Sequence, residues 1–254
     1  MARGKSDDIN QIVGQMSIAD FSTDVTNYVV QSNVLISGKQ DLKLNSMKIL
    51  RAAIMQVDQD DSELKPYIIK ISEIAQMLGV SRERVYQDIY EITEDITRHP
   101  IELKKIEGNK ERWVIIPWVK KCVYSSDVGL LIKLNDELCP YLLNLQEYYA
   151  RYSFDAIVGM KSVFAIRIFE LLISKLPSTE LPEDGEHIIM HVDEIREACG
   201  VQDKHLEFAN FRMRVIDIAQ RDINDYTDFN LSYTYIKKGR KVEYIDFHLI
   251  SKKN

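Results

Sequence analysis

The chain has 254 residues, of which 45% are apolar and 28% are charged, and its formal net charge is −6. This length predicts one or two domains, and the apolar fraction is sufficient for a packed core. No run approaches the roughly 18 apolar residues of a membrane span, and the N-terminal residues lack the apolar stretch of a signal peptide. The sequence therefore indicates a cytoplasmic protein without a membrane segment.

The first half of the chain begins with residues 1–26, which lack a strong hydrophobic periodicity and are expected to form a flexible arm. After this arm the apolar spacing predicts a helix, a short strand, a short helix, a long helix and a hairpin. These elements are Leu44–Val57, Tyr67–Ile71, Ser72–Val80, Ser81–Ile96 and a hairpin that turns at Gly108–Asn109.

The second half repeats this order. Its elements are Lys161–Leu176, His187–Val192, Asp193–Val201, His205–Tyr226 and a hairpin that turns at Gly239. The two short-helix blocks, Ser72–Val80 and Asp193–Val201, share Glu, Ile, Gly and Val at equivalent positions. A short helix, a turn, a long helix and a hairpin are typical of a winged helix-turn-helix, in which the hairpin is the wing. The sequence thus predicts an α+β fold of two tandem winged-helix domains, residues 27–148 and 149–254. A packing module without a ligand is the alternative.

The second predicted long helix carries polar side chains opposite its apolar face. A helical wheel centred on Phe208, Phe211 and Val215 places the candidate DNA-reading residues on the far side or its flank. These candidates are Asn210, Arg212, Met213, Arg214 and Arg221. Arginine reads guanine and asparagine reads adenine through paired hydrogen bonds in the major groove. A solvated helix face is the alternative for each of these residues.

Positive charge is concentrated late in this acidic chain. From Lys204 to the C-terminus there are ten Lys and Arg residues against seven Asp and Glu. Four of these cations surround Gly239 at the predicted tip of the second hairpin: Lys237, Lys238, Arg240 and Lys241. A cationic wing tip beside a duplex would hold DNA phosphates, whereas the simpler reading is a solubilising hairpin tip.

The first half offers weaker candidates for DNA binding. Arg82 lies in the first turn of the first long helix and Arg84 faces outward from it, but acidic neighbours on this helix favour phosphate anchoring over base reading. Lys104 and Lys105 lie on the first predicted hairpin, which we take to be the first wing.

Three stretches of the sequence carry a family pattern. The most specific is Phe211–Ile250, which reads FRMRVIDIAQRDINDYTDFNLSYTYIKKGRKVEYIDFHLI. Leu134–Phe154 contains a Pro-Tyr-Leu segment followed by a helical pattern between the two halves, and Val29–Ile36 reads VVQSNVLI. Together these stretches resemble the initiator replication proteins of iteron-containing plasmids. The resemblance extends from Asn27 to Ser251.

This resemblance implies two winged-helix domains related by pseudo-two-fold symmetry. It implies a bacterial plasmid replication initiator that binds directly repeated origin sequences (iterons) in double-stranded DNA as a monomer. Dimers formed through the first domain would repress the initiator's own gene, and the DNA-bound protein would recruit the host initiator and the replicative helicase. The main base reader in relatives is the second long helix, here with Arg212, Met213 and Arg214. Relatives often carry a third basic residue at the position of Met213.

No enzymatic site is predicted. A rolling-circle nickase would need paired histidines beside a tyrosine, but His187 and His191 lie in an apparent strand, where residues four apart stand about 13 Å apart. We therefore expect no metal, no cofactor and no catalytic residue, and we expect the three separate cysteines to be reduced thiols. Trp113 and Trp118 are expected in the core or a dimer interface. A transcriptional repressor with two winged helices is the main alternative function, and a nickase is a weaker one.

Overall fold

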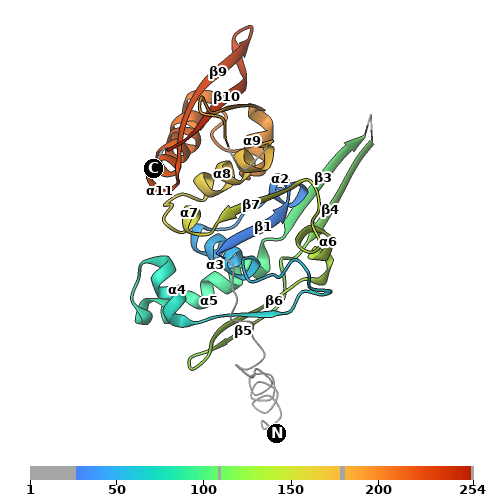
Figure 1. Cartoon of the computed structure of the whole chain (residues 1–254), viewed down its shortest axis with the longest axis vertical. Helices are drawn as coiled ribbons and strands as arrows, with labels where there is room; N and C mark the ends of the chain where they lie inside the picture. The colour runs from blue at the N-terminus through green and yellow to red at the C-terminus, as the bar shows by residue number, and fades with distance from the viewer. Residues whose placement is uncertain (1–26, 108–109, 178–180, 253–254) are drawn as a thin grey trace.

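The computed structural model describes residues 27–107, 110–177 and 181–252. The arm predicted for residues 1–26 and the turn predicted at Gly108–Asn109 lie outside the described residues. The described segments form two α+β halves, with the first half in the lower part of Figure 1 and the second half in the upper part.

The first half contains the elements expected from its apolar spacing, and further strands follow them. Its elements are β1 (Tyr28–Ser32), α2 (Asn33–Ser37), α3 (Leu44–Ile54), β2 (Pro66–Ile69), α4 (Ile71–Leu78), α5 (Arg82–Arg98), β3 (Ile101–Glu107), β4 (Lys110–Ile116), β5 (Val119–Ser125), β6 (Gly129–Leu134), the 3-10 helix η2 (Asp136–Leu138) and α6 (Cys139–Leu142). Val85, Ile89, Ile92 and Ile96 form the buried stripe of α5. The spacing of these four residues matches one face of a helix, which confirms the predicted amphipathic helix.

The second half repeats the arrangement of the first. Its elements are β7 (Tyr149–Ser153), α7 (Asp155–Val158), α8 (Val163–Lys175), β8 (Glu186–His191), α9 (Val192–Ala198), α10 (Phe208–Phe211), the π-helical segment η3 (Arg212–Ile216), α11 (Asp217–Tyr226), β9 (Phe229–Lys238) and β10 (Lys241–Ser251). Its antiparallel sheet has the order β8-β10-β9, and the sheet of the first half has the equivalent order β2-β6-β5. The prediction of two tandem winged-helix domains is confirmed.

The predicted position of the first wing is wrong. The hairpin that directly follows α5, β3–β4, forms a separate two-stranded sheet that projects from the body (Figure 1). The hairpin that completes the winged-helix sheet is β5–β6, because the buried residues Leu130 and Ile132 on β6 pair with Ile69 and Tyr67 on β2. In contrast, β4 is exposed at every position from Lys110 to Ile115, so it offers no buried face to that sheet.

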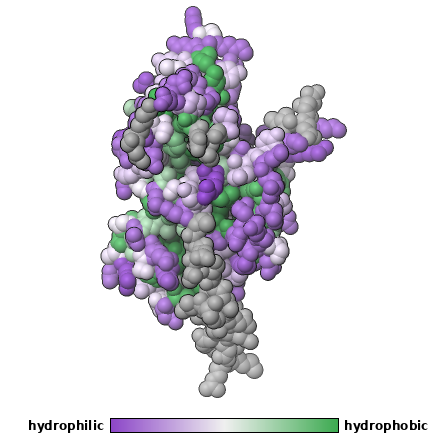
Figure 2. All heavy atoms as spheres, in the orientation of Figure 1, coloured by the Kyte–Doolittle hydropathy of each residue, from purple (hydrophilic) through white to green (hydrophobic). Residues whose placement is uncertain are grey.

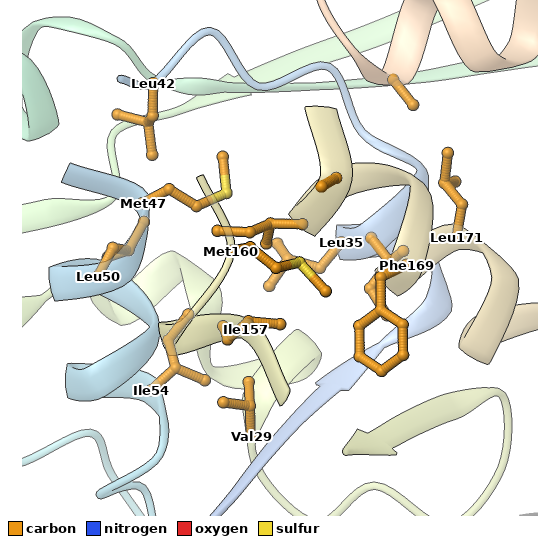
Figure 3. Packing of buried hydrophobic residues seen from close by; sticks show 14 of the residues in the cluster. Val29, Leu35, Leu42, Met47, Leu50, Ile54, Ile157, Met160, Phe169 and Leu171 are labelled. Atoms are coloured by element: carbon orange, nitrogen blue, oxygen red, sulfur yellow. The ribbon is translucent and has the colours of Figure 1, made fainter. Parts of the chain in front are cut away.

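The two halves share one hydrophobic core. β1, at the start of the described chain, pairs antiparallel with β7, from Tyr28 opposite Ser153 to Ser32 opposite Tyr149. In Figure 3 the side chain of Ile54 on α3 lies near Ile157, from the start of the second half. Because this core is continuous, the two winged helices are packed against each other rather than joined by an open linker.

Candidate DNA interface

Both helix-turn-helix units turn at a glycine with a left-handed backbone. Gly79 has φ +66° after α4, and Gly200 has φ +64° after α9. L-residues with a side chain rarely adopt this conformation, so glycine allows the chain to leave the short helix sharply. These are the two glycines that the sequence comparison aligned.

The second turn is longer than the first, and it is held by a residue that the sequence analysis missed. Arg196 of α9 donates hydrogen bonds of 3.0 Å to the carbonyl oxygen of Lys204 and 2.9 Å to that of His205. Its guanidinium carbon also lies 4.1 Å from the ring centre of Phe211. The long helix therefore begins at Phe208, three residues after the predicted start at His205. The signal for this role was an arginine in an otherwise acidic segment.

The candidate reading residues lie where the long helix widens. Arg212, Met213 and Arg214 are consecutive and exposed, between the buried residues Phe211 and Val215. All three belong to η3, a π-helical segment, and such segments are frequent at functional sites. Asn210 is exposed just before this triplet. The widened helix thus presents three adjacent side chains to the outside.

A short chain of polar contacts connects the long helix to the wing. The Nε of Arg212 lies 3.7 Å from Oδ2 of Asp217, and the Tyr233 hydroxyl on β9 donates a hydrogen bond to Oδ1 of the same carboxylate. Partial burial and the hydrogen bond to Asp217 raise the pKa of Tyr233, so this hydroxyl keeps its proton. These contacts fix Arg212 relative to the first strand of the wing.

The second wing ends in a compact group of cations. Gly239, with φ +63°, and Arg240 form the turn between Lys238 and Lys241, and all four residues are exposed. Lys237 precedes them, with its Nζ 5.9 Å from the ring centre of Tyr235. Figure 2 shows hydrophilic side chains at the top of the molecule, where Figure 1 places this hairpin. The tip therefore extends beyond the body and carries positive charge.

A groove joins the wing to the helix-turn-helix. It has a volume of about 800 Å³ and lies between α9, the start of the long helix and the β9–β10 hairpin. Four of the predicted site residues line it: Arg212, Lys237, Arg240 and Lys241. The acidic residues Asp193 and Glu207 also line the groove. Arg196 lines it as well, so the groove carries five guanidinium or ammonium groups, which suit a phosphate backbone more than a neutral ligand.

The first domain lacks the cations of the second at two equivalent places, the long helix and the wing tip. Counted from the N-caps Ser81 and Glu207, the triplet Arg212–Arg214 corresponds to Tyr86–Asp88 on α5. This triplet contains no cation. The tip of the first wing, residues 126–128, reads Ser-Asp-Val where the second wing carries its cations. At these two places, the helix triplet and the wing tip, the cations lie in the second domain.

The remaining predicted site residues lie away from the groove. Arg82 and Arg84 are exposed at the start of α5, where the Nε of Arg84 pairs with Asp88 at 2.8 Å. Arg221 lies on α11, well past the triplet. The prediction that Lys104 and Lys105 lie on the first wing is wrong, because both belong to the separate β3–β4 hairpin. There the Nζ of Lys104 lies 2.9 Å from Glu111.

The histidine and cysteine side chains are held in ordinary contacts. His187 and His191 lie on strand β8 as predicted, and the ring of His187 stacks on that of His248 at 4.2 Å. In the described part of the chain no group of three or more His, Cys, Asp or Glu side chains could hold a metal ion. Burial raises the pKa of the Cys122 thiol to about 11. Among the helices of the described residues, none is long and apolar enough to cross a membrane.

Comparisons with known proteins agree with this geometry. Residues 28–173 match the family model "Initiator Replication protein, WH1", and residues 191–249 match "Initiator Rep protein, WH2". A "Replication initiation protein" from Escherichia coli is 21% identical over 227 residues, which are 87% of this chain and 69% of that protein. An "Uncharacterized 27.6 kDa protein" from Escherichia coli is 23% identical over 238 residues, covering 89% of this chain and 95% of the relative.

A solved structure has the same fold. The crystal structure of the Pi initiator protein in complex with iteron DNA superposes with a TM-score of 0.74 at 16% identity, covering 91% of this chain and all of that one. The two family matches together include most of α8, both helix-turn-helix units and the cationic wing. With both of its winged-helix domains matched in order, the chain belongs to the family of initiator replication proteins.

Proposed function

We propose that this protein initiates plasmid replication in the bacterial cytoplasm by binding directly repeated origin sequences in double-stranded DNA as a monomer. The observation that carries the proposal is the basic groove of the second domain. There the cations of the wing tip lie beside a widened helix that exposes Arg212, Met213 and Arg214. A helix in the major groove reads bases, while a neighbouring basic hairpin holds the phosphates.

The roles of the two domains differ in this proposal. The second domain is the main sequence reader, and Asn210 and Arg221 extend its contact surface on either side of the triplet. The first domain anchors phosphates through Arg82 and Arg84 at the start of α5. Two long helices on one chain suit successive major grooves, which lie about 10 base pairs apart on one face of the duplex.

A dimer formed through the first domain would repress the protein's own gene. The exposed hairpin β3–β4 supports this part of the proposal. Trp113, Val114 and Ile115 on β4 are 69%, 45% and 48% exposed, and within the described residues β4 pairs with β3 alone. An apolar, singly paired strand is suited to pairing with another chain. Trp118, by contrast, is fully buried in the core.

The DNA contact is tested by footprinting on the replication origin of the plasmid that encodes this protein. We expect protection of direct repeats of roughly 20 base pairs each, because two recognition helices one turn apart span about two turns of duplex. Protection of a single segment of one turn would contradict binding by both domains.

The biological role is tested with a supercoiled plasmid carrying the same origin. An initiator opens the AT-rich region and recruits the host initiator and the replicative helicase, so replication in an extract depends on added protein. A repressor binds the origin without supporting replication. A nickase relaxes the supercoils when a divalent metal is added. The proposal that the protein is not an enzyme is overturned if it relaxes the supercoiled plasmid and a tyrosine-to-phenylalanine change abolishes this relaxation.

A further inference from the structure

A cluster of charged side chains is completely buried where the two domains meet. At its centre is the carboxylate of Glu170 on α8, which is fully buried. It accepts hydrogen bonds from Arg51 of α3, with Nε at 2.6 Å and Nη2 at 3.1 Å, and from Nη1 of Arg167 at 2.7 Å. Gln31 of β1 and the hydroxyl of Tyr152 on β7 also donate to it. We call these five residues the junction cluster.

The junction cluster is held in its charged form. Burial alone would raise the pKa of Glu170, but the guanidinium groups of Arg51 and Arg167 outweigh burial and lower this pKa to about 2. Two arginines against one carboxylate leave an excess positive charge in the interior. Replacement of such buried ion groups by apolar side chains of similar size often leaves stability unchanged or raises it. Stability is therefore a weak reason for this cluster, and geometric specificity is a stronger one.

The cluster joins elements from both domains. Arg51 lies on the first helix of the first winged helix, whereas Arg167 and Glu170 lie on the equivalent first helix of the second. In Figure 1 the labels α8, β7 and β1 stand between α4 and α5 below and the β9–β10 wing above. Any rotation of one domain against the other would separate the paired groups of Arg51 and Glu170 in a region without solvent.

Arg167 extends the connection to the second helix-turn-helix. Its Nε donates to the carbonyl oxygen of Ala198, the last residue of α9, at 3.1 Å. Its Nη2 donates to the carbonyl oxygens of Ile36 and Gly38 in the first domain. A Cβ added to Gly200, in the turn after α9, would lie 3.4 Å from the carbonyl oxygen of Gln40. The turn that positions the reading helix is thus in contact with the first domain.

From these contacts we infer that the junction cluster sets the spacing between the two DNA-contacting helices, and that its members are positioning residues for two-domain binding. The inference rests on the proposed function. Each domain alone gives a weak contact, and linkage strengthens binding only when both contacts can form at once. A rigid, hydrogen-bonded junction holds the two DNA-contacting helices at one distance and one relative rotation. A junction filled with apolar side chains allows several distances and rotations.

The test uses the full-length protein and two duplexes: one origin repeat, and the same repeat with one base pair inserted at its centre. The insertion rotates one half-site against the other. We expect the wild-type protein to bind the inserted duplex about 100-fold more weakly, because simultaneous engagement is lost. The variant Arg51→Met/Arg167→Met/Glu170→Leu, which keeps the buried volume, is expected to reduce this ratio to about 10-fold or less.

Two further variants make the result decisive. Phe247→Leu changes the fully buried interior of the second domain away from the junction, and it should keep the wild-type ratio even if affinity falls. Tyr152→Phe removes one hydrogen-bond donor to Glu170 but keeps the aromatic ring, and it should also lower the ratio of the two affinities. This variant replaces the triple variant in the test if circular dichroism shows that the triple variant is unfolded. The inference is overturned if the folded triple variant has the same ratio as the wild-type protein. If the triple variant does not fold, the same result for Tyr152→Phe overturns it. A wild-type protein without preference for repeat DNA would overturn the proposed function, and this inference with it.

Discussion

Arg212, Met213 and Arg214 occupy adjacent positions but offer different chemistry. Arg212 is oriented by Asp217 and lines the basic groove, so its position suits a phosphate. Met213 is 52% exposed and provides apolar contact only, as with a thymine methyl group. Arg214 is the exposed cation next to them and can pair bidentately with guanine. Base specificity should therefore depend most on Arg214.

For Arg214→Ala we expect binding to the origin repeat to weaken by about 1–3 kcal/mol, with relaxed specificity at one base pair. Competition binding against repeats carrying single base-pair changes measures both effects. Arg98→Ala, at the exposed last turn of α5, is the control and should bind like the wild-type protein. If Arg214→Ala binds cognate and random duplexes with unchanged affinities, the assignment of the reading face is wrong.

Lys48 is a buried cation at the junction between the domains. It lies on α3 with 4% of its surface exposed. Burial and then the positive charge of Lys161 lower its pKa to about 8, although Asp222 opposes the shift. An unfolded lysine has a pKa near 10.4. Between about pH 8 and 10.4 the unfolded chain therefore binds a proton that the folded protein lacks, so this group makes the folded protein more stable as pH rises.

The variant Lys48→Met should remove the free-energy cost of burying a charged ammonium group at pH 7. At pH 7 its free energy of unfolding should exceed that of the wild-type protein by about 1–2 kcal/mol, after allowance for solvent screening. The difference should shrink as pH rises through the window from 8 to 10.4. Urea unfolding at pH 7 and pH 10 measures it. Lys43→Met, an exposed neighbour at the start of α3, should show little change at either pH. A gain that is equal at both values would contradict the assignment.

At the scale of elements, the two wings have the same place in the fold and different charge. The β9–β10 tip carries Lys238, Arg240 and Lys241, whereas residues 126–128 of the β5–β6 tip include Asp127 and no cation. Phosphate binding depends on cations that can replace counterions. The second wing should therefore contribute most of the salt dependence of binding.

Lys238→Ala tests this difference between the wings. It should weaken binding to all duplexes alike and reduce the slope of log affinity against log salt by about 1. Lys121→Ala on β5 is the matched change on the first wing and should leave the slope nearly unchanged. Titrations at several salt concentrations provide the measurement. Equal changes of slope in the two variants would show that both wings hold phosphates.

The β3–β4 hairpin is the element suited to self-association. It carries the exposed aromatic side chain of Trp113 on β4. For Trp113→Glu we expect a higher fraction of monomer in sedimentation experiments, because a charge would be buried in the dimer. Monomeric binding to the repeat should be unchanged. Trp113→Phe keeps an apolar ring and serves as the control. A dimer fraction equal to that of the wild-type protein would place the interface elsewhere.

At the scale of the whole molecule, the continuous core and the buried junction cluster join two similar domains. The acidic net charge does not oppose DNA binding, because exposed cations at the tip of the second wing lie close to those of the second long helix. A field that is positive at one surface and negative elsewhere orients the protein as it approaches DNA. The size and spacing of the origin repeats are therefore properties of the whole chain rather than of either domain.

The sequence by itself determined the features that depend on near neighbours. The apolar spacing of Val85, Ile89 and Ile92 defined α5, and the glycines at 79 and 200 defined both turns. The second wing was also predictable, since both of its strands and its Gly239 turn lie within one short segment. In each case the information is local, because a helical face or a tight turn is specified within about ten residues.

Only the tertiary structure decided features that need distant partners. The first wing is β5–β6 because Tyr67 and Ile69 on β2 pair with β6, more than 60 residues away, and nothing near α5 encodes that choice. Likewise, neither Arg167 nor Glu170 was singled out from the sequence, yet both charged side chains are fully buried. Arg51, over 100 residues earlier in the chain, completes that pair. A charged side chain is buried when other elements of the fold pack over it. The apolar periodicity of one helix does not identify a charged partner on another helix.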